Sequence, residues 1–469
     1  MRPRGRPSSD RFPSGSLTTN DNANTIRSHH QLVGPLQVER ITLLPCIHRA
    51  TLAFGFPTRS DVSTRSPHVS EQVCSNILSQ VAGSEELRKT FIGNLSATER
   101  RVEVQAISDC LWNLLHAQET RQGIGRTKLL RLSYQLAKET QIFPRHLLLR
   151  DIKVASQPFA GGGFADVYEG NHKGAKVCVK VLRVFDKSDQ AKFIRGYTRE
   201  ITLWSYMSHE NILPLIGLFT AEHAARRLCL VSPLMKNGNL RCFLQNHPDT
   251  SRLPLVLDIT EGLTYLHLLK IIHGDLKAQN VLISDTGRAL LTDFGLSYVV
   301  LTSAVHGSSG FMAAGTTRWM APELFSECTA PSKESDIWAF GCLCFEIYTG
   351  QYPFYQHKSS GAVVAALLRN EIPRLPTGND IRVPPGVLDD WMWDLINSRC
   401  WCQNPKERHS AQMIRDAVAT RLVHGGLPGV FTRNNSRAPE LPEAQGCLLH
   451  ELDYEYIAHV LIQSAESLK

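Results

Sequence analysis

The sequence predicts an α+β fold in which a small β-rich part precedes a larger helical part, with a small helical region in front of both. Short runs of β-branched and aromatic residues are concentrated between about residues 152 and 235. Beyond them, Leu255, Ile259 and Leu263 begin a stretch in which apolar residues recur at helical spacing. The same helical spacing occurs before Pro144, ahead of the β-rich runs.

Composition and charge argue against some classes of protein. The chain has 469 residues and a formal net charge of +7, of which +5 lies in residues 1–70 with their nine Arg and four acids. The remainder is nearly balanced, which argues against a nucleic-acid-binding core. The twelve Cys show no C-x-x-C framework, so we expect reduced thiols and a cytoplasmic protein, with the nucleus as the alternative. No run of 18 apolar residues occurs, so we expect no membrane span.

Residues 1–70 are interpreted as a disordered basic tail rich in Ser and Pro. Pro3–Pro7 matches the core of an AT-hook, in which Arg-Gly-Arg lies in an A·T minor groove. The match is five residues long and occurs once, so a solvated basic tail is the preferred interpretation over nucleic-acid binding.

Residues 71–143 form the predicted helical region. Ser96 and Glu99 fit a capping box that would begin a helix. The apolar faces of this helix and of a second one, which ends before Pro144, consist of Val104, Ile107, Leu111, Leu114, Leu115, Leu129, Leu132 and Leu136. Such faces fit a structural core, and a regulatory module that binds a protein partner is the alternative.

Within the β-rich part, a Gly-rich turn at Phe159–Tyr168 separates two strands. Its glycines would let backbone N–H groups approach phosphate oxygens. Lys180 follows in the next strand, and Glu200 lies in an amphipathic helix from which it could pair with Lys180. Leu228–Met235 is a further predicted strand that runs into a linker.

The richest polar stretch follows two apolar residues, Ile271 and Ile272. It places Asp275, Lys277 and Asn280 in one tight loop. Asp293-Phe294-Gly295 begins thirteen residues after Asn280. A group-transfer enzyme needs this set, because it combines a base for a hydroxyl, a cation for a phosphoryl group and oxygen ligands for magnesium.

In this order and at these distances, the motifs of residues 152–422 resemble those of protein kinases. The resemblance implies a bilobal fold, ATP and Mg²⁺ as cofactors, and a protein substrate. Asp275 would orient the substrate hydroxyl and Lys277 would neutralise the γ-phosphate. Asn280 and Asp293 would bind magnesium.

The resemblance also implies a nucleotide site. Lys180, held by Glu200, would contact the α- and β-phosphates, and Ser232 would be the gatekeeper beside adenine. The residues expected around the nucleotide are Ala160, Gly161, Gly162, Gly163, Phe164, Ala165, Val167, Cys178, Lys180, Ser232, Leu234 and Leu282.

Three structural relationships follow from the same resemblance. Glu323, at the end of an activation segment that begins at Gly295, is expected to pair with Arg408. Asp336 is expected to hydrogen-bond the backbone of the catalytic loop. Thr316 is expected to contact Asp275 and Lys277.

The substrate class is implied by two details. Lys277 lies two residues after Asp275, as in Ser/Thr kinases, whereas Trp319-Met320-Ala321-Pro322-Glu323 is similar to tyrosine kinases. This mixture resembles the tyrosine-kinase-like group of Ser/Thr kinases. We therefore expect phosphate transfer to Ser and Thr of proteins, in signal transduction.

Several positions depart from the family pattern. Gly274 replaces the usual Arg, which predicts activity without activation-segment phosphorylation. Ala160 and Ala165 replace two glycines, and we expect weaker nucleotide binding if either has a positive φ. Cys178 replaces an Ala and is interpreted as a small apolar contact.

Two classes of function remain. An active Ser/Thr kinase is favoured because the Lys, the base and the metal-binding residues are all present. A pseudokinase scaffold is the alternative, based on Ala160, Ala165 and Gly274. Residues 423–469 form a C-terminal tail with a short predicted helix at Tyr454–Leu461, for which docking on the kinase core, autoinhibition and disorder all stay open.

Overall fold

The computed structural model describes residues 67–96, 98–117, 124–161, 165–182, 190–221, 227–293, 298–299, 316–326, 330–377, 388–425 and 452–466. The predicted basic tail, including the Pro3–Pro7 match, lies outside these residues up to residue 66. Among the described residues, no helix has both the length and the apolar character needed to cross a membrane.

The β-rich lobe is one antiparallel sheet in the order β1-β3-β4-β6-β5, with β2 paired to β3. Val177, Val179 and Val181 alternate along β4 and pack in one buried cluster with Cys229 and Val231 of β6. This period of two is what places one face of each strand in the core. The strands are β1 Lys153–Val154, β2 Ala160–Gly161, β3 Ala165–His172, β4 Ala175–Leu182, β5 Gly217–Ala221 and β6 Arg227–Pro233.

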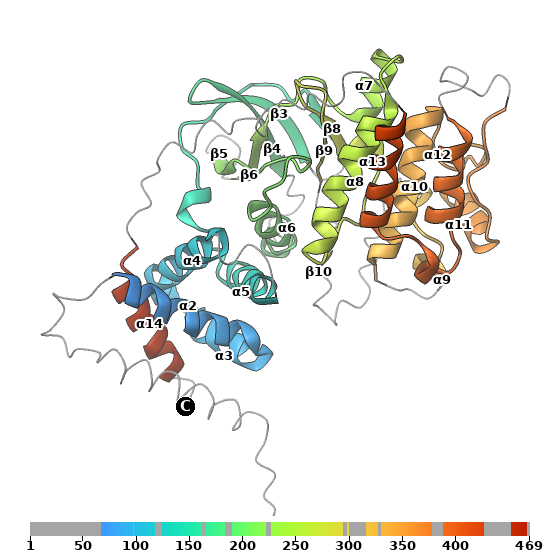
Figure 1. Cartoon of the computed structure of the whole chain (residues 1–469). Coiled ribbons are helices and arrows are strands. Elements are labelled where there is room, and N and C mark those ends of the chain that lie inside the picture. Colours follow the sequence, from blue (N-terminus) through green and yellow to red (C-terminus); the bar gives the residue numbers. More distant parts are fainter. Residues whose placement is uncertain are drawn as a thin grey trace, which may run out of the picture.

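Helix α6, Gln190–Ser205, lies between this sheet and the N-terminal helices (Figure 1). Its apolar residues Ile201 and Trp204, together with the adjacent Met207, are buried as the amphipathic pattern predicts. The indole of Trp204 donates a hydrogen bond to the carbonyl of Leu213. The helix is therefore fixed against the main hydrophobic core on this side.

The second lobe is helical and is built around α10, Lys333–Thr349, in which residues 335–349 are all buried. A helix that is apolar on every side belongs in the centre of a domain. Two short strand pairs, β7 with β10 and β8 with β9, lie between the lobes. The elements are α7 Leu240–Asn246, α8 Arg252–Leu268, β7 Ile271–Ile272, β8 Val281–Ile283, β9 Ala289–Leu291, β10 Tyr298–Val299, α9 Glu323–Ser326, α11 Ser360–Leu368, α12 Asp390–Asp394 and α13 Ala411–His424. The predicted bilobal α+β fold is confirmed.

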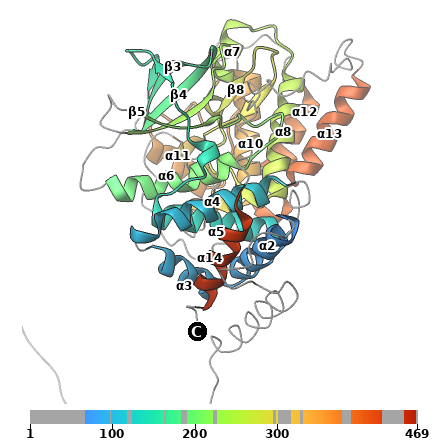
Figure 2. The ribbon, with the colours of Figure 1, turned by 90° about the vertical axis from the view of Figure 1, so that its left-hand side faces the viewer.

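A further helical bundle combines helices that precede the sheet in the sequence with helix α14, which follows the helical lobe (Figure 2). The C-terminal helix α14 packs against three N-terminal helices and buries Ile457 and Leu461 among them. The short helix predicted at Tyr454–Leu461 is present, extends five residues beyond Leu461 and contacts the N-terminal helices. The bundle consists of α2 Pro67–Gly83, α3 Glu85–Leu95, α4 Arg101–His116, α5 Ile124–Thr140 and α14 Tyr454–Glu466.

The predicted helix start at Ser96 is wrong. Ser96 is the C-cap of α3, and its hydroxyl donates to the carbonyl of Ile92 at 2.7 Å. A 3₁₀ turn at Thr98–Arg100 follows, and α4 begins at Arg101 without a side-chain cap. The hydroxyl is thus engaged with the preceding helix, so it cannot cap the next one. All eight apolar residues predicted for the two helix faces are buried.

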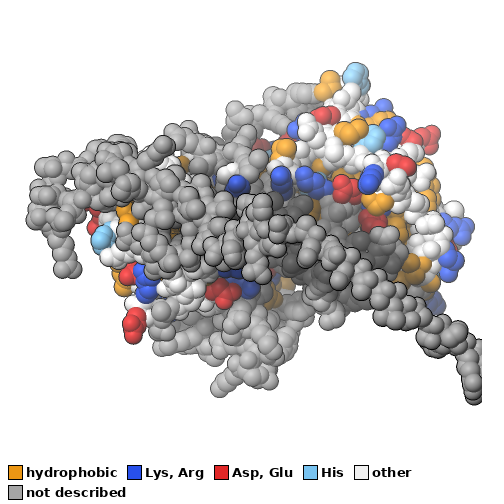
Figure 3. Space-filling model, turned by 90° about the horizontal axis from the view of Figure 1, so that it is seen from below, with side chains coloured by type: hydrophobic (Ala, Val, Ile, Leu, Met, Phe, Trp, Pro, Cys, Tyr) orange, Lys and Arg blue, Asp and Glu red, His pale blue; other side chains and the backbone are white. Residues whose placement is uncertain are grey.

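The surface of the described residues carries mixed charge. In the view from below, the coloured part of the molecule shows basic and acidic side chains beside one another (Figure 3).

Candidate active site

The catalytic loop connects β7 to β8 and brings together the three polar residues predicted for it. Asp275 Oδ2 accepts hydrogen bonds from Lys277 Nζ at 2.7 Å and from Asn280 Nδ2 at 2.7 Å. Asn280 Nδ2 also donates to the carbonyl of Asp275 at 2.8 Å. Asp275 Oδ1 is buried and has no hydrogen-bond partner among the residues that the structure describes. One carboxylate oxygen is therefore fixed, and the other is left to accept a proton or a hydrogen bond from a ligand.

Asp336 of α10 anchors the catalytic loop through hydrogen bonds to the loop backbone. This buried carboxylate accepts the backbone N–H groups of His273 and Gly274, each at 2.9 Å, and lies 2.9 Å from Nε2 of His267. The predicted contact between Asp336 and the loop backbone is confirmed. Buried carboxylates of this kind need such donors, because an unpaired buried charge is strongly destabilising.

A second anchor was missed by the sequence reasoning. Glu346, which lies closer than Asp336 to the C-terminal end of α10, accepts hydrogen bonds from the backbone N–H of Ala278 at 3.1 Å and from Nη1 of Arg241 at 2.8 Å. Burial raises the pKa of Glu346, and these two donors oppose the rise. The available signal was an acid inside a long apolar helix, which predicts a buried and paired carboxylate.

Lys180 joins the two lobes. Its ammonium lies 2.6 Å from Asp293 Oδ1 and 3.4 Å from Glu200 Oε1, so the predicted pair with Glu200 is present and is shared with Asp293. Burial disfavours the charge on Lys180, but the two carboxylates outweigh this effect and raise the pKa of Lys180. Burial dominates at Glu200 and raises its pKa. For Asp293, the cation of Lys180 overcomes burial and lowers the pKa.

Asp293 has a φ of 63°, a conformation that residues with a side chain seldom adopt and that clusters at functional sites. The backbone N–H of Thr292 donates to the carbonyl of Asn280 at 3.0 Å, which brings the two predicted metal-binding residues side by side. Because Asn280 Nδ2 donates to Asp275, its Oδ1 is the atom left for a cation. Phe294 and Gly295 lie outside the described residues.

The nucleotide-binding positions are placed in part. Ala160 and Ala165 lie in strands β2 and β3, and neither has a positive φ, so neither alanine is strained. Val167, Leu234 and Leu282 are half-buried, at β3, the end of β6 and β8. The Gly-rich positions Gly162 and Gly163, with Phe164, lie outside the described residues, whereas Gly161 ends β2.

Cys178 and Ser232 face each other across β4 and β6. Burial raises the pKa of the Cys178 thiol to about 11, and a hydrogen bond with Ser232 opposes the rise. A thiol with this pKa is protonated at neutral pH, which agrees with the interpretation as a packing residue.

Gly274, which departs from the family pattern, has a φ of 80°. A side chain in this region costs roughly 1–3 kcal/mol, so glycine suits the local backbone. The candidate phosphorylation sites of the activation segment, Thr302, Ser303, Ser308 and Ser309, lie outside the described residues.

The end of that segment is described. Arg408 makes two parallel hydrogen bonds to Glu323, at 2.7 and 2.8 Å, and its side chain is fully buried, so the predicted pair is confirmed. Lys277 Nζ donates to Thr316 Oγ1 at 3.3 Å, as predicted for that pair.

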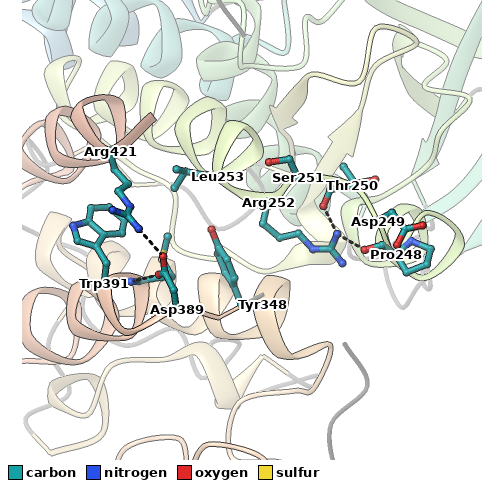
Figure 4. A pocket seen from close by; sticks show the side chains of 11 residues that line it. Pro248, Asp249, Thr250, Ser251, Arg252, Leu253, Tyr348, Asp389, Trp391 and Arg421 are labelled. Atoms are coloured by element: carbon teal, nitrogen blue, oxygen red, sulfur yellow. Dashed lines mark hydrogen bonds and ion pairs between the residues drawn. The ribbon is translucent and has the colours of Figure 1, made fainter. Parts of the chain in front are cut away.

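A cavity of about 400 Å³ lies elsewhere in the helical lobe, between α8, α10, α12 and α13 (Figure 4). Arg421 pairs with Asp389 at 3.0 Å on one side, and Arg252 donates to backbone carbonyls on the other. None of the catalytic-loop residues lines this cavity.

Comparison with known proteins decides the family. Residues 157–418, more than half of the chain, match the model of the protein kinase domain. The chain belongs to the protein kinase family. The match lies within the predicted kinase region 152–422, and the resemblance to the tyrosine-kinase-like group is confirmed by the relatives.

The kinase domain is similar to several curated proteins. The serine/threonine/tyrosine-protein kinase HT1 of Arabidopsis thaliana is 32% identical over 53% of this chain and 61% of its own length. The serine/threonine-protein kinase STY17 of the same organism is 27% identical over 55% of this chain and 43% of its own length. The serine/threonine-protein kinase TNNI3K of Rattus norvegicus is 28% identical over 65% of this chain and 35% of its own length. The match therefore spans less than two thirds of the length of each of these relatives.

Proposed function

We propose that this protein is an ATP-dependent protein kinase that transfers the γ-phosphate to Ser and Thr hydroxyls of protein substrates, in signal transduction. The observation that carries the proposal is the catalytic loop. Asp275 has one oxygen fixed by Lys277 and Asn280 and a second buried oxygen with no partner among the described residues. A substrate hydroxyl is the group that this oxygen would accept.

The chemistry follows from the positions of these groups. The substrate oxygen attacks the γ-phosphorus, the bond from that phosphorus to the β,γ-bridging oxygen breaks, and the hydroxyl proton passes to Asp275. Lys277 lies beside Asp275 and would offset charge on the transferring phosphoryl group. Lys180 would do the same for the remaining phosphates, because its raised pKa keeps it charged.

Asp293 and Asn280 fit a magnesium ion. They offer a carboxylate of lowered pKa and an amide oxygen, and Mg²⁺ prefers such oxygen ligands together with phosphate oxygens. When bound, Mg²⁺ would supply charge neutralisation at the phosphates. The protein's own part is to keep both side chains adjacent through the Thr292–Asn280 backbone hydrogen bond.

Ser and Thr are proposed as acceptors on two grounds. Lys277 contacts both Asp275 and Thr316, so the loop and the end of the activation segment are joined as the Ser/Thr pattern implies. Relatives named as serine/threonine kinases support the same class. HT1 carries tyrosine in its name as well, so a tyrosine acceptor belongs in the test.

The test is phosphate transfer from labelled ATP with Mg²⁺ to three peptide pools that differ only in Ser, Thr or Tyr. We expect labelled Ser and Thr and little labelled Tyr. Transfer to Tyr alone would overturn the acceptor class. No transfer to any pool, with nucleotide still bound, would favour the pseudokinase scaffold.

A further inference from the structure

We propose that the helical bundle of α2–α5 and α14 is a positioning element of the kinase site, and that Arg126 and Tyr206 transmit its position to Glu200. The inference rests on the proposed function, since it assigns a role in the same reaction. Helices α2–α5 and α14 form this bundle together, and it contacts α6 through α5 and lies below α6 in both ribbon views (Figures 1 and 2).

The bundle forms hydrogen bonds and ring contacts with Tyr206, the residue that follows the C-terminal end of α6. Arg126 of α5 is buried and donates Nη2 to the carbonyl of Tyr206 at 2.8 Å, and its Nη1 donates to the carbonyl of Leu115 at the end of α4. The hydroxyl of Tyr206 is within 3.2 Å of Ser133 Oγ, and its ring lies 5.2 Å from that of Trp112. One guanidinium thus ties the ends of α4 and α6 together.

The segment that follows α5 also attaches the bundle to the sheet. After α5 the chain passes along β5, where Leu148 bridges Leu218 and the N–H of Leu149 donates to the carbonyl of Leu218 at 2.7 Å. Gly217 permits this approach, because a Cβ atom there would lie 2.5 Å from the carbonyl oxygen of Leu147. The bundle is therefore fixed to the sheet that carries Lys180 as well as to the helix that carries Glu200.

These two attachments hold the two elements that carry the Lys180–Glu200 ion pair, namely the sheet and helix α6. Glu200 lies six residues before Tyr206, about 9 Å along the helix axis, so a shift at the end of α6 moves Glu200. Glu200 is 2% exposed and is therefore stable as an anion only while it faces Lys180. By linkage, docking of the bundle on α6 and the paired state of Glu200 stabilise each other.

The C-terminal helix completes this unit. Ser464 of α14 accepts from Arg100 at 3.2 Å, and the carbonyl of Tyr454 lies 3.6 Å from Cys74 Sγ. Val460 and Leu461 fill the space between the N-terminal helices. The bundle that positions α6 thus includes residues from beyond the end of the kinase domain.

The simplest alternative is a passive bundle that only adds stability. Arg88 provides a matched control, because it is also a buried arginine of the bundle that donates to a backbone carbonyl, that of Ala82, and to Gln135. Its hydrogen bonds to the described residues lie within the bundle, and none of them reaches α6. Arg126→Gln and Arg88→Gln each remove one buried guanidinium, and only the first loosens α6.

The experiment compares the full-length wild type with Arg126→Gln and Arg88→Gln. It measures kcat, KM for ATP and backbone hydrogen exchange of α6. We expect Arg126→Gln to speed exchange in α6 and to lower kcat, each by about tenfold, from the loss of charged hydrogen bonds. Arg88→Gln should leave α6 exchange and kcat within about twofold of the wild type. Equal losses of kcat in both variants, or unchanged α6 exchange in Arg126→Gln, would overturn the proposal.

Tyr206→Phe covers the case in which Arg126→Gln does not fold. It retains the ring and the backbone carbonyl and loses only the hydroxyl at Ser133, so we expect a smaller decrease of kcat, about threefold. Should the wild type transfer no phosphate at all, the proposed function fails. The positioning proposal is then decided by α6 exchange and by affinity for an ATP analogue, and it fails if neither differs between the Arg126 and Arg88 variants.

Discussion

Asp336 accepts the backbone N–H of Gly274 at 2.9 Å, immediately before the catalytic Asp275. The same carboxylate accepts the N–H of His273, so one buried side chain fixes two consecutive peptide groups. We predict that Asp336→Asn, which retains one acceptor oxygen, lowers kcat by about tenfold and the free energy of unfolding by about 1–3 kcal/mol. The measurements are steady-state kinetics and thermal unfolding.

Asp416→Asn is the control for this prediction. Asp416 is an exposed acid on α13 whose carboxylate pairs with the neighbouring Arg415. It should change neither quantity appreciably, because exposed ion pairs contribute little. An unchanged kcat in Asp336→Asn would show that the loop does not depend on this anchor.

The pair of Arg408 and Glu323 is predicted to be structural. Arg408 is fully buried, its guanidinium also lies over Trp338, and it donates to the carbonyls of Glu334 and Cys402. Arg408→Ala would remove the guanidinium that donates to Glu323 and to these carbonyls. We expect a loss of about 3–5 kcal/mol in the free energy of unfolding.

A double-mutant cycle with Glu323→Gln separates the pair from the packing of Arg408. Glu323→Gln should cost less than Arg408→Ala, because Glu323 is partly exposed and the glutamine retains an acceptor. Strictly additive losses in urea unfolding would contradict a direct coupling between the two side chains.

Much of the active site could be predicted because its residues fill fixed family positions. Lys180 pairs with Glu200 as predicted, whereas its second ion pair, with Asp293, does not follow from the sequence pattern. Glu346 was missed: its position in an apolar helix indicates a buried, paired carboxylate, but the sequence does not indicate which groups donate to it.

Outside the kinase domain, local patterns were less informative. The Ser96 hydroxyl could cap the helix on either side of it. The backbone geometry, and not the sequence motif, decides that Ser96 caps the C-terminal end of α3. The docking of α14 could not be predicted either, because it joins residues nearly 400 positions apart, as the contact of Cys74 with Tyr454 shows.

Gly274 leads to a prediction about regulation. The usual Arg that meets a phosphate on the activation segment is absent, so phosphorylation there should not be required. The variant in which Thr302, Ser303, Ser308 and Ser309 are all replaced by Ala should retain kcat within about twofold of the wild type. Loss of activity in this variant, measured after phosphatase treatment of both proteins, would refute the prediction.

Cys178 is predicted to be poorly reactive. Burial raises its pKa to about 11, so the thiolate fraction at neutral pH is about a hundredfold lower than for an ordinary thiol near 9. Iodoacetamide labelling followed by peptide mass spectrometry should modify the exposed Cys242 first. As the pH is raised towards this pKa, the rate at which Cys178 is labelled should increase about tenfold for each pH unit. Rapid labelling of Cys178 at pH 7 would contradict its assignment as a packing residue.

The most direct measurement compares phosphate transfer and nucleotide binding in the wild type and in Asp275→Ala. In the proposed mechanism, the Asp275 oxygen that has no partner among the described residues meets the reacting hydroxyl, and Lys180 and Asp293 serve the phosphates and the metal. The account predicts that Asp275→Ala retains its affinity for ATP with Mg²⁺ while kcat falls by at least about 10³-fold. Transfer that persists in Asp275→Ala at the wild-type rate would contradict the central claim.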